Sequence, residues 1–141
     1  MPDSPAPIDA VPRRYILSLG GWHAEINERG AAVLSLSRGG RSRPPLPRVP
    51  YGPAADADWR LTELVVVEDD CGFATLVHVL PPEDGRPELR LQVRYDFSIE
   101  GFTTAFTVEN TGGRAGAVEL GGTVVTLYPG DRHVSVSTDS V

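Results

Sequence analysis

The sequence predicts an all-β protein, built as an antiparallel β-sandwich. Apolar residues occupy every second position from Leu89 to Ile99, the period of a strand with one buried and one solvated face. The Glu100–Gly101 pair then interrupts the pattern before it resumes at Phe102, as expected for a hairpin. Short strand-like segments separated by Gly or Pro recur along the chain, and no convincing helical pattern is found.

The elements of the first third are short. We predict strands at 14–19, 22–27 and 31–37, because each alternates and each ends at a glycine-containing turn. The stretch 41–53 contains five prolines. Proline lacks the N–H that a sheet ladder needs, so this stretch is expected to be a loop or a sheet edge.

The elements of the remaining two thirds include two long hairpins. Segments 59–68 and 73–80 form one predicted hairpin, and the alternating stretch that starts at Leu89 begins the other. Residues 81–87 are a predicted connector, and strand-like segments at 118–128 and 133–137 complete the chain. A small closed sandwich or a barrel would accommodate these eight or nine strands.

Composition limits the class of protein. The chain has 141 residues and is 40% hydrophobic, which suits a single globular domain over 13–141 behind a flexible, Pro- and Ala-rich tail at 1–12. The net charge of -6 disfavours nucleic acid as a partner. No apolar run approaches the roughly 18 residues of a membrane span. The first residues lack the basic and apolar regions of a signal peptide, so a cytoplasmic location without membrane contact is expected.

Residue usage adds two expectations. All 13 basic residues are arginine, which indicates GC-rich bacterial coding. The single cysteine, Cys71, excludes an internal disulfide, and no histidine is near it in sequence to activate it as a nucleophile. The three histidines lie on different predicted strands, and none forms a spaced metal motif. We therefore predict neither a metal site nor a cofactor.

Two residues are candidates for acid–base chemistry. His78 lies between two leucines that share one face of its strand, a position that can point into a cavity. Glu63 interrupts the apolar face of the neighbouring strand, and a carboxylate in a polar pocket there could serve as a general base. The turn carboxylates Asp69 and Asp70 are expected to cap backbone amides.

Three blocks of the sequence, at residues 24–41, 63–80 and 89–114, carry a family pattern. Together they resemble the aldose 1-epimerases of the galactose mutarotase-like superfamily. Residues 24–41 are similar to the opening hairpin of the family, and residues 63–80, which follow Trp59, are similar to its next strand pair. Residues 89–114 resemble the Val-x-Tyr strand, hairpin and Asn-Thr-Gly turn of the family. The blocks occur in the family's order and cover over half of the chain, so the resemblance implies a β-sandwich that binds sugars.

The same comparison shows where this chain departs from the family pattern. Residues 120–130 stand where the family has a catalytic histidine and contain none. The family's His-Gly is replaced by 56–58, and its Pro-Asn-Arg motif survives only as Pro47–Arg48. The catalytic glutamate comes from a later part of longer family members. Mutarotation needs both an acid and a base, so the resemblance implies a domain without ordinary mutarotase activity, with Arg48 as its carried-over sugar contact.

These observations support three hypotheses of function. The first is a non-catalytic domain that binds a carbohydrate or a similar small ligand through arginine and aromatic side chains, namely Arg48, Tyr51, Trp59, Arg94 and Tyr95. The second is a small isomerase or cyclase of secondary metabolism that uses His78 and Glu63 in a cavity. The third is a domain whose exposed sheet binds another protein. A homodimer is expected to cover apolar sheet surface.

Overall fold

The computed structural model describes residues 13–19, 21–42, 51–68 and 71–140. They form an all-β, antiparallel structure, in which the only helical element among the described residues is the 3-10 turn η1 (Gly52–Ala54). The first sheet has the order β1-β2-β3-β4, with β1 (Arg14–Leu19), β2 (Trp22–Asn27), β3 (Ala32–Arg38) and β4 (Arg41–Ser42).

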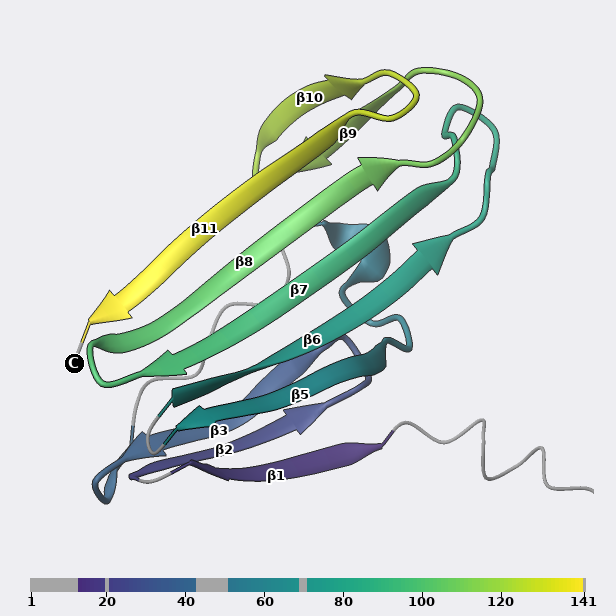
Figure 1. The fold of residues 1–141 in the computed structure, drawn as a ribbon. Coiled ribbons are helices and arrows are strands. Elements are labelled where there is room, and N and C mark those ends of the chain that lie inside the picture. Colours follow the sequence, from purple (N-terminus) through teal and green to yellow (C-terminus); the bar gives the residue numbers. More distant parts are fainter. Residues whose placement is uncertain (1–12, 20, 43–50, 69–70, 141) are drawn as a thin grey trace, which may run out of the picture.

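The second sheet contains the long strands (Figure 1). Its order is β11-β8-β7-β6-β5, with β5 (Arg60–Glu68), β6 (Cys71–Leu80), β7 (Leu89–Ser98), β8 (Gly101–Asn110) and β11 (Arg132–Ser140). A separate hairpin joins β9 (Gly116–Leu120) to β10 (Thr123–Leu127). The sheets are open at their edges in the described part of the chain. The sandwich expected from the sequence is therefore observed, and the closed barrel is not.

Most predicted strands are confirmed, with two local differences. The segment 118–128 is divided into β9 and β10 by Gly121 and Gly122, whose φ angles of 57° and 90° suit the tight turn of a two-residue hairpin. Ile99 lies in the turn after β7 and is exposed, so the buried alternation of β7 ends at Phe97. The predicted tail at 1–12 lies outside the described residues.

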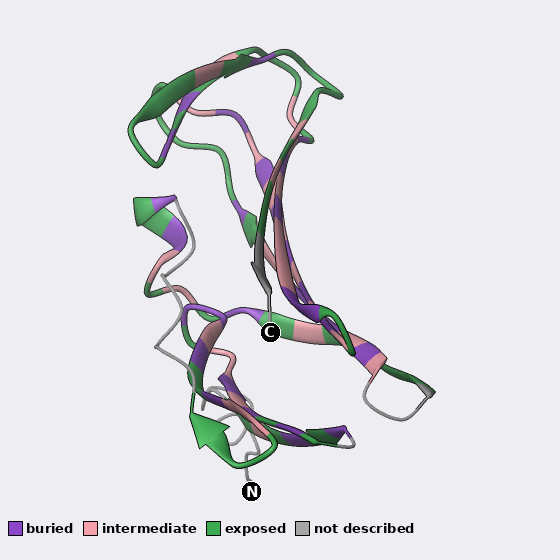
Figure 2. Ribbon diagram, turned by 90° about the vertical axis from the view of Figure 1, so that its left-hand side faces the viewer, coloured by how far each residue is buried: buried purple, intermediate pink, exposed green. Residues whose placement is uncertain are grey.

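Aromatic side chains join the two sheets, and buried residues occur along the strands of both (Figure 2). The Trp22 ring lies 5.7 Å from that of Phe97 and 6.2 Å from that of Phe102, and its Nε1 donates a hydrogen bond to the Ser98 carbonyl at 3.1 Å. We call the side of the five-stranded sheet that contacts Trp22 its inner face. The alternation of β7 places Leu89, Leu91, Val93, Tyr95 and Phe97 on this face.

The rest of the inner face is covered by the η1 segment and the β9–β10 hairpin. Trp59, which follows η1, packs 6.5 Å from Phe106 of β8. The fully buried Asn110 fixes the hairpin and its flanking loops: its Nδ2 donates to the carbonyls of Arg114 at 2.8 Å and Leu127 at 3.0 Å. Its Oδ1 accepts from the Gly112 amide at 2.9 Å. With the inner face covered in this way, the opposite, outer face of the sheet is the broad surface left to solvent.

Candidate functional site

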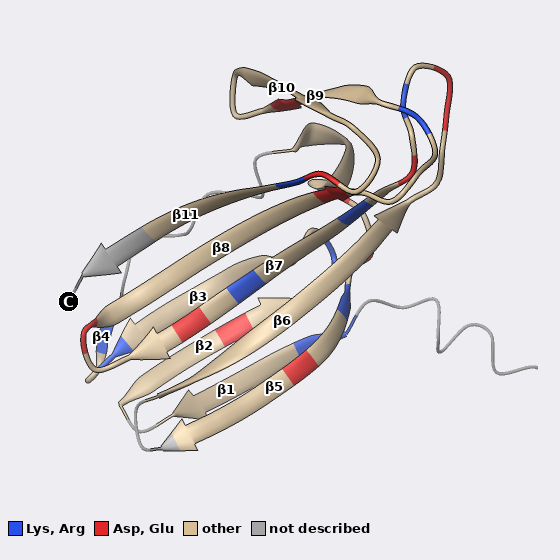
Figure 3. Cartoon of the chain, turned by 45° about the horizontal axis from the view of Figure 1, so that its top comes forward, with Lys and Arg blue, Asp and Glu red and all other residues tan. Residues whose placement is uncertain are grey.

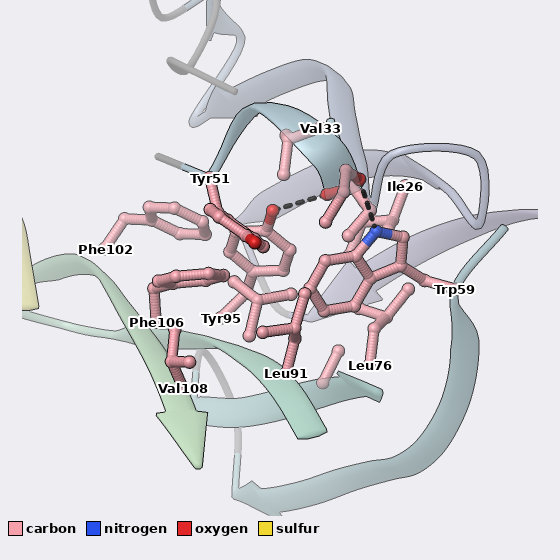
Figure 4. Close-up of a cluster of buried hydrophobic side chains, with 14 of the residues drawn as sticks. Ile26, Val33, Tyr51, Trp59, Leu76, Leu91, Tyr95, Phe102, Phe106 and Val108 are labelled. Carbon is pink, nitrogen blue, oxygen red and sulfur yellow. Dashed lines mark hydrogen bonds between the residues drawn. The ribbon is translucent and has the colours of Figure 1, made fainter. Parts of the chain in front are cut away.

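The three aromatic residues expected to contact a ligand lie in the hydrophobic core (Figure 4). Trp59 is 2% exposed, and its indole N–H donates to the Ala54 carbonyl at 3.0 Å. Tyr51 and Tyr95 are also buried, and the Tyr95 hydroxyl donates to the carbonyl of Ala31. Burial raises the pKa of Tyr95 far above its ordinary value, so this phenol remains a neutral donor. All three side chains therefore have structural roles in the described fold.

Arg94 lies on the opposite side of the sheet from Tyr95. Successive residues of a strand point to opposite faces, and β7 buries Tyr95 while Arg94 is only half-buried on the outer face. The structure thus separates two residues that the sequence grouped as one ligand surface. Arg48 lies outside the described residues.

The acid–base candidates are also separated. His78 pairs with Leu91 on the inner face, where its Nδ1 donates to the Asp58 carbonyl at 2.9 Å and its ring lies 5.8 Å from Trp59. Glu63 pairs with Thr75 on the outer face and is exposed. Since the two side chains lie on opposite sides of one sheet, they cannot act together on a single substrate.

Glu63 reaches the outer face because of a β-bulge. The register of β5 and β6 shifts between Leu61 and Glu63, and an extra residue in one strand reverses the faces that follow it. The hydroxyl of the intervening Thr62 donates to the Thr75 carbonyl at 3.2 Å. Without this bulge, the sequence pattern predicts Glu63 on the same face as Leu61, whereas the structure places it on the opposite face.

The outer face carries a compact group of side chains at the centre of β6 and β7, which we call the Thr75 cluster. It consists of Phe73, Thr75, Arg94 and Asp96. Phe73 is the cross-strand partner of Asp96, and Thr75 is the cross-strand partner of Arg94, so the four form a square on one face. Charged residues of both signs follow β7 through this region (Figure 3).

Two residues of the cluster, Asp96 and Phe73, hold the Arg94 side chain in place. Its Nε and Nη2 donate to the two carboxylate oxygens of Asp96 at 2.9 and 3.1 Å. Its guanidinium carbon lies 3.7 Å above the centre of the Phe73 ring, a cation–π contact. The side chains of Arg94 and Asp96 remain 42% and 36% exposed. The pair is therefore pre-positioned and still open to solvent, with several donors and acceptors unused by the ion pair.

Thr75 supplies the unusual feature of the cluster. Only 3% of this residue is exposed, and its Oγ1 has no hydrogen-bond partner among the described residues. Leaving a buried hydroxyl unpaired costs about 1–3 kcal/mol, and an orphan of this kind in a folded protein calls for an explanation. The oxygen is itself buried, so an incoming polar group beside Arg94 would provide the missing partner only when a covering side chain moves aside.

Glu63 extends the cluster on the side of β5. It is the cross-strand partner of Thr75, so the order across three strands is Glu63, Thr75, Arg94. Neighbouring strands are about 4.8 Å apart, which places the backbones of Glu63 and Arg94 about 10 Å from each other. The structure therefore brings together two of the residues singled out in the sequence, with the orphan hydroxyl between them.

Sequence reasoning missed Phe73 and Thr75. The signal that could have found them was the register of the β6–β7 hairpin, because pairing Phe73 with Asp96 automatically pairs Thr75 with Arg94.

The turn residues Asp69 and Asp70 lie outside the described part of the chain. Cys71 is a half-buried free cysteine at the start of β6. Within the described residues, no group of three acidic, histidine or cysteine side chains is placed to hold a metal ion.

Comparison of the chain with protein-family models, with curated proteins and with solved structures gives no match in any of the three. The resemblance to aldose 1-epimerases therefore stays a prediction from the sequence. None of the described residues belongs to a helix long and apolar enough to cross a membrane. The functional argument consequently depends on the geometry of the Thr75 cluster.

Proposed function

We propose that this chain is a non-catalytic binding domain that recognises a carbohydrate, or a similar polyhydroxylated small molecule, on the outer face of its five-stranded sheet. The single observation that carries the proposal is the orphan hydroxyl of Thr75 beside the half-exposed Arg94–Asp96 pair. With a covering side chain moved aside, the ligand would supply the hydrogen bond that the buried Thr75 hydroxyl lacks in the free protein.

The chemistry of the cluster suits hydroxyl groups. Each sugar hydroxyl both donates and accepts a hydrogen bond, and the cluster offers both functions within a few ångströms. Arg94 provides guanidinium N–H donors, Asp96 provides carboxylate acceptors, and Thr75 provides a hydroxyl that can serve either way. The Phe73 ring is occupied by Arg94, so polar contacts, rather than stacking of a sugar ring on an aromatic, would dominate recognition.

The placement of the titratable groups supports a non-catalytic role. Acid–base catalysis needs a donor and an acceptor within hydrogen-bond reach of the same substrate. Asp96 is tied to Arg94 in a two-bond ion pair, and His78 lies on the other side of the sheet. Among the described residues, Glu63 is the remaining carboxylate beside the cluster, and it can supply only one of the two groups that acid–base catalysis needs. The cluster thus favours holding a ligand over transforming it.

The decisive experiment is a titration of the 15N-labelled protein with neutral mono- and oligosaccharides, followed by amide chemical shifts. We expect saturable shifts confined to β5, β6 and β7 around the cluster. Shifts confined to the inner-face segments, or no saturable shift with any sugar of the panel, would contradict the proposal.

Two variants make the test specific. Replacing Thr75 by Val removes the orphan hydroxyl, so the free protein should gain about 1 kcal/mol in stability while affinity for the sugar falls about 3- to 10-fold. Replacing Arg94 by Ala should weaken binding more strongly. The matched control is Arg132→Ala, which removes an arginine from the edge strand of the same sheet, where it lies 3.9 Å from a carboxylate oxygen of Glu109. This control should bind sugar like the unmodified chain.

A further inference from the structure

The two edges of the five-stranded sheet differ in how they are protected against pairing. Strand β5 forms one edge and has register shifts at two places, between Leu61 and Glu63 and between Val66 and Glu68. Bulges and charged residues are the devices by which proteins keep an edge strand from pairing with another chain. Strand β5 therefore has an irregular and charged edge.

Strand β11 forms the other edge and lacks these devices. Its register with β8 is continuous from Arg132 to Ser140. The residues from His133 to Ser137 contain no proline and no acidic or basic side chain other than the histidine itself. Figure 3 shows this uncharged stretch of β11. A regular, uncharged edge presents unpaired backbone N–H and C=O groups as a template for a further strand.

The outer face of β11 is also apolar. Val134 is 51% exposed and Val136 is 63% exposed. Their partners on β8 are Thr107 and Ala105, so no long side chain of the adjacent strand covers them. Two large apolar side chains thus lie on the exposed side of the unprotected edge.

We propose that β11 is a self-association edge, through which two copies of this chain pair in antiparallel fashion about Ser135. Pairing about this residue places Val134 opposite Val136 of the second copy, and Val136 opposite Val134 of the second copy. Directly opposed residues of an antiparallel pair share a face, so all four valines meet on the continuous outer face. Ser135 then lies opposite its own copy on the inner face.

The self-complementarity of this register argues for a second copy over an unrelated partner. One two-fold operation satisfies both valines and the backbone hydrogen bonds of both edges at once. From Arg132 to Thr138 the pairing brings no like charges together, because Arg132 lies opposite Thr138 of the second copy. Beyond this segment Asp131 lies opposite Asp139 of the second copy, a like-charge pair at each end that weakens the contact and is screened by salt. The net charge of -6 on each chain opposes association at long range, a repulsion that salt screens.

The size of the contact sets its strength. A contact through a single nine-residue edge strand buries less surface than the roughly 800 Å² per partner of a standard stable interface. The dimer is therefore weak, in the micromolar range or above, and is favoured by added salt.

Sedimentation velocity over a wide concentration range tests the proposal. The unmodified chain should pass from monomer to dimer, and Val136→Arg should weaken the dimer at least 10-fold. The matched control is Val65→Arg, which places the same charge on the outer face of the bulged edge β5 and should leave the dimer intact. A monomer at every concentration, or a dimer lost in Val65→Arg and retained in Val136→Arg, would overturn the proposal.

Amide hydrogen exchange of the unmodified chain supplies a measurement that needs no variant. Alternate amides of β11 point away from β8, and they should become protected as the protein concentration rises. Protection that stays constant on β11 while the sedimentation coefficient increases would assign the contact to another surface and overturn the proposal.

Discussion

The hydroxyl of Tyr95 donates a hydrogen bond to the carbonyl of Ala31, a residue 64 positions earlier in the chain. Ala31 has a φ of 51°, the only positive value among the described residues other than glycine. A left-handed alanine costs about 1 kcal/mol or more and persists only where its surroundings fix it. The bond from Tyr95 therefore joins the five-stranded sheet to a strained turn of the four-stranded sheet.

Replacing Tyr95 by Phe should destabilise the fold by about 1–3 kcal/mol. The change keeps the ring and leaves the buried Ala31 carbonyl without its donor. Urea unfolding monitored by tryptophan fluorescence measures the difference. Tyr128→Phe is the matched control, since Tyr128 is 61% exposed, and it should change the free energy of unfolding by less than about 0.5 kcal/mol. Equal effects of the two changes would exclude a structural role for the Tyr95 hydroxyl.

The raised pKa of Tyr95 predicts a loss of stability in alkali. Burial makes the folded state hold this proton more tightly than the unfolded state, in which the pKa is about 10. The stabilisation is complete below pH 10 and is lost progressively as the pH rises above it. Unfolding free energies measured across this range should fall less steeply for Tyr95→Phe than for the unmodified chain. Parallel curves would show that Tyr95 is not the group responsible.

Replacing Gly30 and Gly39 by Ala separates the conformational cost of a left-handed alanine from the additional cost of a steric clash. Both have positive φ angles, 70° and 59°. A Cβ at Gly30 would lie 2.2 Å from the Ala55 carbonyl oxygen, whereas one at Gly39 would meet nothing within 4 Å. Gly39→Ala should cost about 1 kcal/mol from conformation alone. Gly30→Ala should cost about 1–3 kcal/mol more from the clash, and thermal unfolding of the two variants gives the comparison.

The fold should be destabilised both when the Asn110 side chain is removed and when it is replaced by a charged one. Asn110→Ala leaves the buried Leu127 carbonyl, the partly buried Arg114 carbonyl and the Gly112 amide without their partner, and we expect a loss of about 1–3 kcal/mol. Asn110→Asp keeps the shape but directs a carboxylate oxygen at those carbonyls. Its carboxyl should have a raised pKa, so this variant should regain stability as the pH falls toward 4. An Asp variant with the same pH dependence as the unmodified chain would contradict the assignment of the amide as donor.

Glu63 is also expected to protect against aggregation. It precedes four exposed apolar residues on edge strand β5, Leu64 to Val67. Charged residues beside such a segment oppose intermolecular pairing. Glu63→Val should increase turbidity and thioflavin binding on mild heating. Glu100→Val, which removes the same charge from an exposed turn, should not, and equal aggregation of both variants would point to net charge alone as the cause.

Much of the fold could be predicted from the sequence because strands have a simple period. The alternation in β7 identified its buried residues from Leu89 to Phe97, and glycine positions gave the turns that bound β1 and β2. The prediction failed where a local irregularity changed the count. A single bulge in β5 moved Glu63 to the outer face, and the Gly121–Gly122 turn divided one expected strand into two.

The candidate site was less accessible to sequence reasoning because it depends on pairing between strands. Aromatic residues were expected to contact a ligand. Trp59 and Tyr95 lie in the core instead, because burial of their large apolar rings is favourable and their polar atoms keep hydrogen-bond partners there. Arg94 and Glu63 were identified individually. Their relation through Thr75 follows only from the register of three strands.

The alternation of β7 has a consequence for how this protein could diverge. Tyr95 and Arg94 are consecutive, yet one serves the interior and the other serves the exposed cluster. Substitutions can therefore refine either function independently. An insertion or deletion of one residue in this strand would exchange the two roles along all the positions beyond it, so we expect descendants to vary in side chains here while preserving the spacing.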